Sequence, residues 1–255
     1  FKQKTAYEIG VRLVGSEMCI RDRMYMSTDF SDLSLMQISD SFFPTGLYTM
    51  SNGLETLFSE KRITGMDELY ELIQTNIVQQ IGPCDCVALS NAYDHTSTND
   101  LEKIIICDRS LFAMKLVKEL RESTCRSGTQ MIKCVNSFVA NDTLSKYYDM
   151  IKNSQAPGTH AVGIGVVSNI LGIEKQKAVL HFLYGFSVSM VGAALRLGII
   201  EHIQSQKILH KLKPVIAETC DKYISKSLSD MWQFAPECDV IQITHEQQFS
   251  KMFIT

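Results

Sequence analysis

Two cysteines near the middle of the chain have the residue type and spacing that a metal site could use. Cys84 and Cys86 flank Asp85 in the run PCDC, and thiolates are good ligands for soft metal ions. A C-x-C pair is a weak signal, because closed sites take three or four ligands and His95 lies more than two helical turns away. Buried thiols are therefore favoured, and an all-α metal carrier or enzyme that uses Cys84 and Cys86 remains the alternative.

The histidines do not form an obvious catalytic or metal-binding set; they are His95, His160, His181, His202, His210 and His245. His181 lies in an apolar run and fits a core or interface position. Two of the others, His202 and His210, are eight residues apart and could share a helix face. Two imidazoles without a supporting carboxylate make a poor metal site.

Sequence motifs of nucleotide binding and catalysis are missing. The chain has no GxxxxGK[ST] loop, no HExxH pair and no serine on a nucleophile-elbow turn. Residues 163–172, GIGVVSNILG, have the first two glycines of a GxGxxG loop but lie on a helical apolar run. The sequence predicts no catalytic residue, no resident cofactor and no metal site, so we expect a binding protein rather than an enzyme.

The stretch LMQISDSFFPTGLYTMSNGLETLF, residues 35–58, has polar and turn-forming residues between two apolar helical segments. Pro44 and Gly46 predict a turn, and Tyr48 offers a large contact area with a polar tip. A docking surface is one interpretation. The other is a plain helix-turn-helix corner, in which Asp40 and Glu55 cap turns or helix ends.

Helical periodicity recurs through most of the sequence, and strand alternation is scarce. Pro83 is expected to open a helix, and Pro214 to separate a helix that starts at Ile203 from one over about 215–228. The chain shows no internal repeat and no linker composition. We therefore predict a single all-α bundle of roughly ten helices over residues 24–229, followed by an irregular C-terminal tail over 230–255.

The run AVLHFLYGFSVSMVGAAL, residues 178–195, carries no formal charge. Gly185, Ser189 and Gly192 interrupt it, so we expect a buried central helix against which another helix backbone packs closely, and no membrane span. Arg196 follows the run. It is expected to cap the helix C-terminus or to project into an interface.

The C-terminal tail combines apolar and charged residues in a segment too short for its own core. Phe249, Met252, Phe253 and Ile254 alternate with charged or titratable side chains that include His245. Such a segment is expected to dock on something, and a partner protein is favoured over the chain itself.

The first 23 residues differ from the rest and resemble a frame translation of sequencing-adapter DNA, so we expect the native chain to start at Met24 or Met26. Removing their five basic and three acidic residues from totals of 25 and 28 leaves 20 and 25, a formal charge of −5. This balance disfavours nucleic-acid binding. The scattered cysteines and the lack of a signal peptide predict reduced thiols and a cytoplasmic protein.

Four segments, in order along the chain, resemble the urease accessory protein UreF family. Residues 35–58 are similar to its signature LxQLxDSxxPxGxxxxSxGLE, with matches at Gln37, Asp40, Ser41, Pro44, Gly46, Ser51, Gly53, Leu54 and Glu55. Met50 stands where many members have histidine. A mid-chain segment matches at Glu119, Arg121, Ser123 and Gly128.

The other two segments lie closer to the C-terminus. One resembles RLGxxGxxxxQ at Arg196, Leu197 and Gln206, with Glu201 in place of glycine. The last is similar to HExxxSRLF and keeps His245, Glu246, Gln248, Ser250 and Phe253. Lys251 replaces the common arginine and Met252 the leucine, so a forked arginine contact is not expected there.

The resemblance implies an all-α, dimeric, non-enzymatic scaffold for nickel insertion into urease. Its implied partners are UreD (also called UreH), the GTPase UreG and the urease apoprotein. The candidate partner-binding residues are Asp40, Pro44, Gly46, Tyr48, Ser51, Glu55, Arg196, His245, Glu246, Gln248, Lys251 and Phe253.

Overall fold

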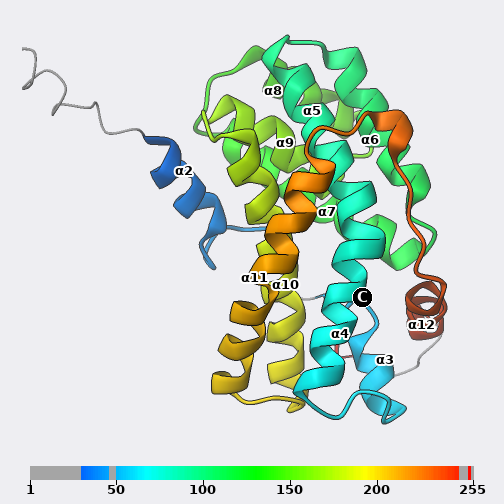
Figure 1. The fold of residues 1–255 in the computed structure, drawn as a ribbon. Helices are drawn as coiled ribbons and strands as arrows, with labels where there is room; N and C mark the ends of the chain where they lie inside the picture. Colours follow the sequence, from blue (N-terminus) through cyan, green and yellow to red (C-terminus); the bar gives the residue numbers. More distant parts are fainter. Residues whose placement is uncertain (1–29, 46–49, 247–251, 254–255) are drawn as a thin grey trace, which may run out of the picture.

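The computed structural model describes residues 30–45, 50–246 and 252–253, whose regular structure is entirely helical (Figure 1). The all-α prediction is confirmed for this part of the chain. The N-terminal 23 residues, Gly46, Tyr48, Gln248 and Lys251 lie outside the described residues. In chain order the helices are α2 (Phe30–Ser39), α3 (Leu54–Ser59), α4 (Met66–Asn76), the π-helix η2 (Ile77–Cys86), α5 (Val87–Ser97), α6 (Leu101–Met114), α7 (Lys118–Asn136), α8 (Asp142–Lys152), α9 (His160–Ile170), α10 (Lys175–Leu197), α11 (His202–Tyr223), the 3-10 helix η3 (Leu228–Asp230) and α12 (Pro236–Glu246).

The core lies around α9, which packs against α5 and α7. Residues 160–168 of this helix are all buried, because small and aliphatic side chains surround the helix axis on every side. The long helices α10 and α11 pack against each other on one side of the bundle (Figure 1). Helix α12 lies beside the short helix α3, at the end of the molecule away from α8 (Figure 1).

The prediction that Pro83 opens a helix is wrong, because α4, η2 and α5 form one continuous helical run with Pro83 inside its π-helical part. Proline has no N–H, so in an α-helix the carbonyl of Gln79 would lose its partner. Here Gln79 O accepts from Phe234 N at 2.9 Å, and Pro83 O accepts from Trp232 N at 3.3 Å. The proline thus fastens the C-terminal segment to the helix.

The break predicted at Pro214 is also absent, because α11 continues from His202 to Tyr223. Ile208, Leu212 and Ile216 are buried along one face of this helix. Their packing offsets the hydrogen bond that Pro214 removes.

Within the part of the chain that the structure describes, no backbone closely approaches the glycines of the small-residue stripe on α10. A Cβ added at Gly185 or at Gly192 would meet no atom within 4 Å among the described residues, so the predicted close approach is wrong. Length and composition make α10 the one described helix that could cross a membrane, with 44% of the tested window buried. This is weak support for a span, because buried core helices pass the same test.

Close packing occurs instead at Gly128 on α7. A Cβ there would meet the backbone of Gly158 and lie 2.6 Å from the carbonyl carbon of Thr159. This turn is fixed by the buried carboxylate of Asp108, which accepts from Gly158 N at 2.7 Å and from Thr159 N at 2.8 Å. The backbone therefore cannot easily retreat from a larger side chain.

We predict that Gly128→Ala lowers the free energy of unfolding by about 3 kcal/mol, the upper part of the usual range for overpacking. The matched control is Gly185→Ala, also within a helix, which should be neutral or stabilising by up to about 1 kcal/mol. Urea denaturation of both variants measures the difference. Equal effects of the two substitutions would contradict this account of the packing.

Candidate functional site

The C-terminal segment over 230–255 was predicted to be irregular because it lacks helical periodicity. The structure instead forms a helix within it. Helix α12 starts at Pro236, a residue suited to the first helical position, and its first turn contains Glu237 and Asp239. It packs so closely on the start of α3 that a Cβ on Gly53 would lie 2.9 Å from Cγ2 of Ile241. Gly53 also has φ of 84°, which favours glycine at this helix start.

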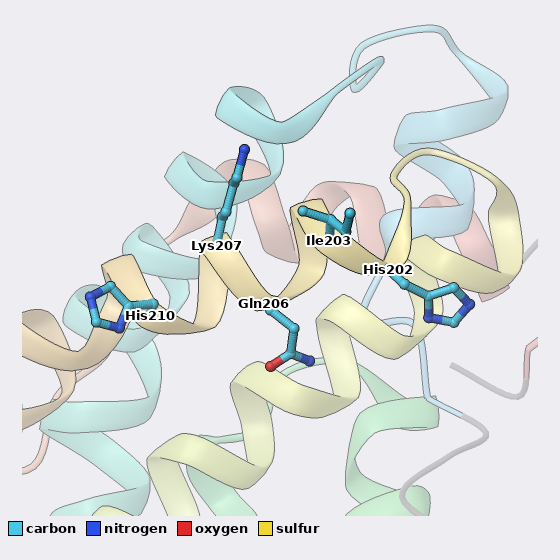
Figure 2. Close-up of a pocket in the computed structure, with 5 residues that line it drawn as sticks. All are labelled: His202, Ile203, Gln206, Lys207 and His210. Atoms are coloured by element: carbon cyan, nitrogen blue, oxygen red, sulfur yellow. The ribbon is translucent and has the colours of Figure 1, made fainter.

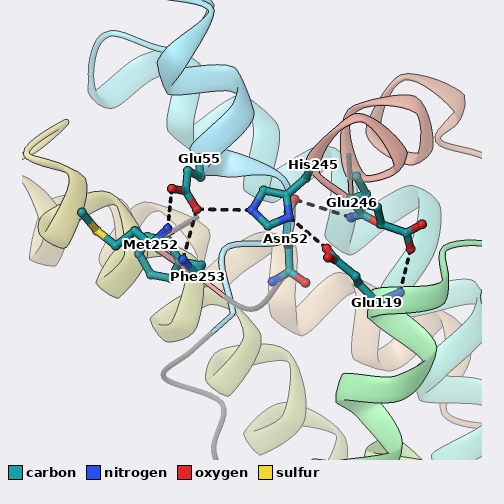
Figure 3. A network of polar contacts seen from close by, with 8 residues as sticks. Asn52, Glu55, Glu119, His245, Glu246, Met252 and Phe253 are labelled. Carbon is teal, nitrogen blue, oxygen red and sulfur yellow. Dashed lines mark hydrogen bonds and ion pairs between the residues drawn. The ribbon is translucent and has the colours of Figure 1, made fainter. Parts of the chain in front are cut away.

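His245, near the end of α12, connects two helices through both of its ring nitrogens (Figure 3). Its Nδ1 lies 2.9 Å from Oε2 of Glu119 on α7, and its Nε2 lies 3.2 Å from Oε2 of Glu55 on α3. The imidazole is 1% exposed. An ionised carboxylate can only accept, so a ring nitrogen that carries a proton can donate to the glutamate beside it.

Glu55 also fixes the chain beyond α12. Its carboxylate accepts from the backbone N–H of Met252 at 2.7 Å and of Phe253 at 3.1 Å (Figure 3). Phe253 is buried, and the guanidinium carbon of Arg196 lies 4.5 Å from its ring centroid. Arg196 also donates from Nε to Gly192 O at 3.1 Å, one turn earlier in α10, so it contacts both this helix and the tail.

Glu246 completes the arrangement by capping α7. Its Oε1 accepts from Glu119 N at 2.7 Å, in the first turn of that helix. The N-cap residue Val117 has no side-chain cap bond of its own, so an acid from α12 satisfies one of the free N–H groups. We call Glu55, Glu119, His245 and Glu246 the tail clasp.

The tail clasp and its contacts bring together five of the predicted site residues: Glu55, Arg196, His245, Glu246 and Phe253. Ser51, also predicted, is buried just before α3. Asp40 and Pro44 lie elsewhere, in the turn after α2. Asp40 caps this turn by accepting from Phe42 N at 2.8 Å, as the capping interpretation expects.

Other residues of the site were not predicted as site residues. The sequence analysis named Glu119 only as part of the family resemblance. It did not name Arg62, which pairs with Glu237. Glu119 and His245 are 126 positions apart in the sequence. Nothing in the spacing of these residues could indicate the contact.

The described part of the tail packs on its own chain, the less favoured of the two expectations. Three apolar side chains of this segment are nevertheless exposed: Val240 (62%) and Ile243 (44%), three positions apart on α12, and Met252 (66%). We call these three residues the outer apolar face. Docking of this face on a partner stays a prediction.

The cysteine alternative receives no support from the surroundings of the two thiols. Cys84 and Cys86 are fully buried. Burial raises the pKa of the Cys84 thiol to about 12, against an opposing effect of Lys115, and raises the pKa of Cys86 well above its usual value. Protonated thiols are poor metal ligands.

His202 and His210 also fail to converge. Figure 2 shows their rings at the two ends of a stretch of α11, pointing away from each other past Ile203, Gln206 and Lys207. Among the described residues, no group of three or more His, Cys, Asp or Glu side chains is placed to hold a metal ion.

The pKa values of two further histidines, the buried His160 and the partly exposed His181, are lowered. Burial lowers the pKa of His160 to about 3, with a smaller contribution from His181. Burial also lowers the pKa of His181, whose Nδ1 lies 3.0 Å from Ser39 Oγ, to about 4. Both rings are therefore neutral near pH 7.

Comparisons with known proteins agree with the family resemblance. The family model described as UreF matches residues 63–213. The urease accessory protein UreF of Trichodesmium erythraeum (strain IMS101) is 34% identical over 229 residues, which are 89% of this chain and 99% of that protein. UreF 1 of Brucella melitensis biotype 1 is 28% identical over 87% of this chain and 92% of its own length. UreF of Photorhabdus laumondii is 27% identical over 87% and 96%.

We predict that Glu55→Gln speeds hydrogen exchange at the amides of Met252 and Phe253 by tenfold or more. The neutral amide weakens the charge-assisted bonds to both N–H groups and to His245. Exchange measured by mass spectrometry tests this, with Glu71→Gln on the exposed face of α4 as the control. Unchanged exchange in Glu55→Gln would show that the carboxylate does not hold the tail.

A second prediction concerns acid stability. Between pH 6.5 and about 3, His160 is protonated in the unfolded chain but stays neutral in the folded protein. The free energy of unfolding therefore falls as the pH falls through this window. The contribution of His160 is up to about 1.4 kcal/mol per pH unit. Urea denaturation between pH 6.5 and 5 should give a shallower slope for His160→Asn than for the wild type. The same slope in both, with the exposed His210→Asn as control, would contradict the prediction.

Proposed function

Because this chain belongs to the UreF family of urease accessory proteins, we propose that it is a non-catalytic scaffold for urease maturation. In this proposal it binds UreD (UreH) and recruits the GTPase UreG. The assembly inserts nickel into the urease apoprotein, with nickel as the cargo. We further propose that the protein works as a homodimer in the cytoplasm.

The observation that carries this proposal is the outer apolar face of α12 and the tail. Three large apolar side chains, Val240, Ile243 and Met252, are exposed close to one another in sequence, next to the buried Phe253. Exposed apolar patches with polar rims are typical of protein interaction sites. This face is therefore proposed as the contact for UreD.

The tail clasp gives this face a defined shape before a partner arrives. The clasp residues attach α12 to α3 and α7, and Glu55 holds the backbone at Met252 and Phe253. A segment that is already ordered loses less conformational entropy on binding, which favours affinity. The clasp residues thus support recognition through position rather than through direct contact.

We predict that Val240→Asp combined with Ile243→Asp weakens binding to the cognate UreD at least tenfold, because charge replaces apolar contact at the centre of the face. Ile106→Asp on α6, where the native side chain is 54% exposed, is the matched control. Co-purification and calorimetric titration with UreD measure the effect, and circular dichroism confirms folding.

Two results would count against the proposal. Equal UreD affinity of the double variant and the wild type would remove the outer apolar face from the interface. A folded wild-type chain that binds neither UreD nor UreG would overturn the scaffold function itself.

A further inference from the structure

The chain between η3 and α12 crosses the outside of the bundle in an extended conformation. Figure 1 shows this segment running along one edge of the molecule to α12. We call residues 231–235 the strap. Its first residue, Met231, has φ of −64° and ψ of 133°, and no residue of the strap is helical. It packs along η2 on one side and faces solvent on the other.

The side chains of the strap alternate between the bundle and the solvent, as expected of an extended chain. Met231 packs against the core and Ala235 is buried. Between them, Gln233 donates from Nε2 to the carbonyl of the last residue of α6, at 2.5 Å. The two intervening side chains point outward, with Trp232 40% and Phe234 71% exposed.

The backbone of the strap is fixed at both exposed aromatic residues. The N–H of Trp232 donates to Pro83 O at 3.3 Å, and the N–H of Phe234 donates to Gln79 O at 2.9 Å. Both bonds are made by the main chain and leave the aromatic rings free to contact another molecule. A partner that binds these rings meets an ordered backbone, which lowers the entropy cost of association.

The strap continues the exposed apolar surface of α12. On this helix Pro236, Val240 and Ile243 are exposed and spaced by four and three, so they share the side turned away from the buried Ile241. The strap leads directly into this side of the helix at Pro236. Exposed apolar side chains therefore follow one another along residues 232–243.

Charged side chains border this row of apolar residues. Arg62, in the connection between α3 and α4, pairs with Glu237 in the first turn of α12, and both side chains are exposed. An apolar centre with a polar rim is the usual composition of a protein interface. Single exposed apolar residues are normal on a protein surface, whereas a contiguous set indicates a binding site.

We propose that the strap is part of the UreD contact, with Trp232 and Phe234 as its aromatic anchors. Aromatic residues are enriched at interfaces, and tryptophan is prominent among those whose truncation costs most affinity. Continuity selects this partner over a second copy of the chain, because a protein seated on Val240 and Ile243 also borders the strap. This inference rests on the proposed function and extends the contact beyond α12.

The strap can be observed directly, because Trp232 is the single tryptophan of the chain. The full chain labelled with 5-fluorotryptophan gives one fluorine NMR resonance, and unlabelled UreD adds none. Addition of UreD should shift this resonance. It should also reduce the difference between the positions of the resonance in H2O and in D2O, because that difference reports exposure of the indole ring to solvent.

Truncation of each aromatic side chain measures its contribution to affinity. Trp232→Ala and Phe234→Ala should each weaken UreD binding by about tenfold in calorimetric titration, since both remove an anchor. The main-chain bonds to η2 remain in both variants, and urea denaturation confirms folding. Phe138→Ala, outside this surface and 49% exposed in the native side chain, is the matched control and should leave the affinity unchanged.

Two results would overturn the strap contact and leave the proposed function standing. One is unchanged UreD affinity in both aromatic variants, although Val240→Asp with Ile243→Asp weakens binding. The other is a Trp232 resonance that responds to the concentration of the chain alone and not to UreD, which would assign the strap to a second copy. A folded wild-type chain that does not bind UreD would overturn the strap contact together with the proposed UreD contact of α12.

Discussion

The attachment of the C-terminal segment to η2 is the constraint on which the C-terminal half of the architecture depends. The carbonyls of Gln79 and Pro83 in this π-helix accept from the backbone N–H groups of Phe234 and Trp232. The chain after η3 is thereby held along η2, and from there it continues into α12 beside α3 (Figure 1). A residue that ordinarily ends a helix here provides the acceptor that guides a distant segment.

The tail clasp attaches the same C-terminal segment to α3 and α7 through polar contacts. Three glutamates from three helices, α3, α7 and α12, surround one imidazole or cap one helix start. Helix α3 has six residues and would not be stable alone, so its position depends on these contacts and on the burial of Leu54 and Leu57. The three elements stabilise one another, and removal of one carboxylate weakens contacts in all of them.

Periodicity predicted most of the helices, because their apolar faces repeat at helical spacing. The prolines misled the prediction, since the bonds and packing that offset Pro83 and Pro214 come from residues far along the chain. The same holds for the site, where resemblance indicated Glu55 and His245 but nothing in the sequence could place Glu119 against them. The glycines of α10 show a third limit of prediction from sequence. Their small size indicated a close neighbour, whereas in the structure Gly185 and Gly192 line a cavity.

The tail clasp also has a consequence for the order of events during synthesis on the ribosome. Glu55 is translated early, but its acceptors are filled by the amides of Met252 and Phe253, nearly 200 residues later. Until the C-terminal segment has been synthesised, α3 and the start of α7 lack the hydrogen bonds that Glu55 and the N–H of Glu119 make with it. The contacts of Glu55 with the chain beyond α12 therefore form only after residue 253 has been translated.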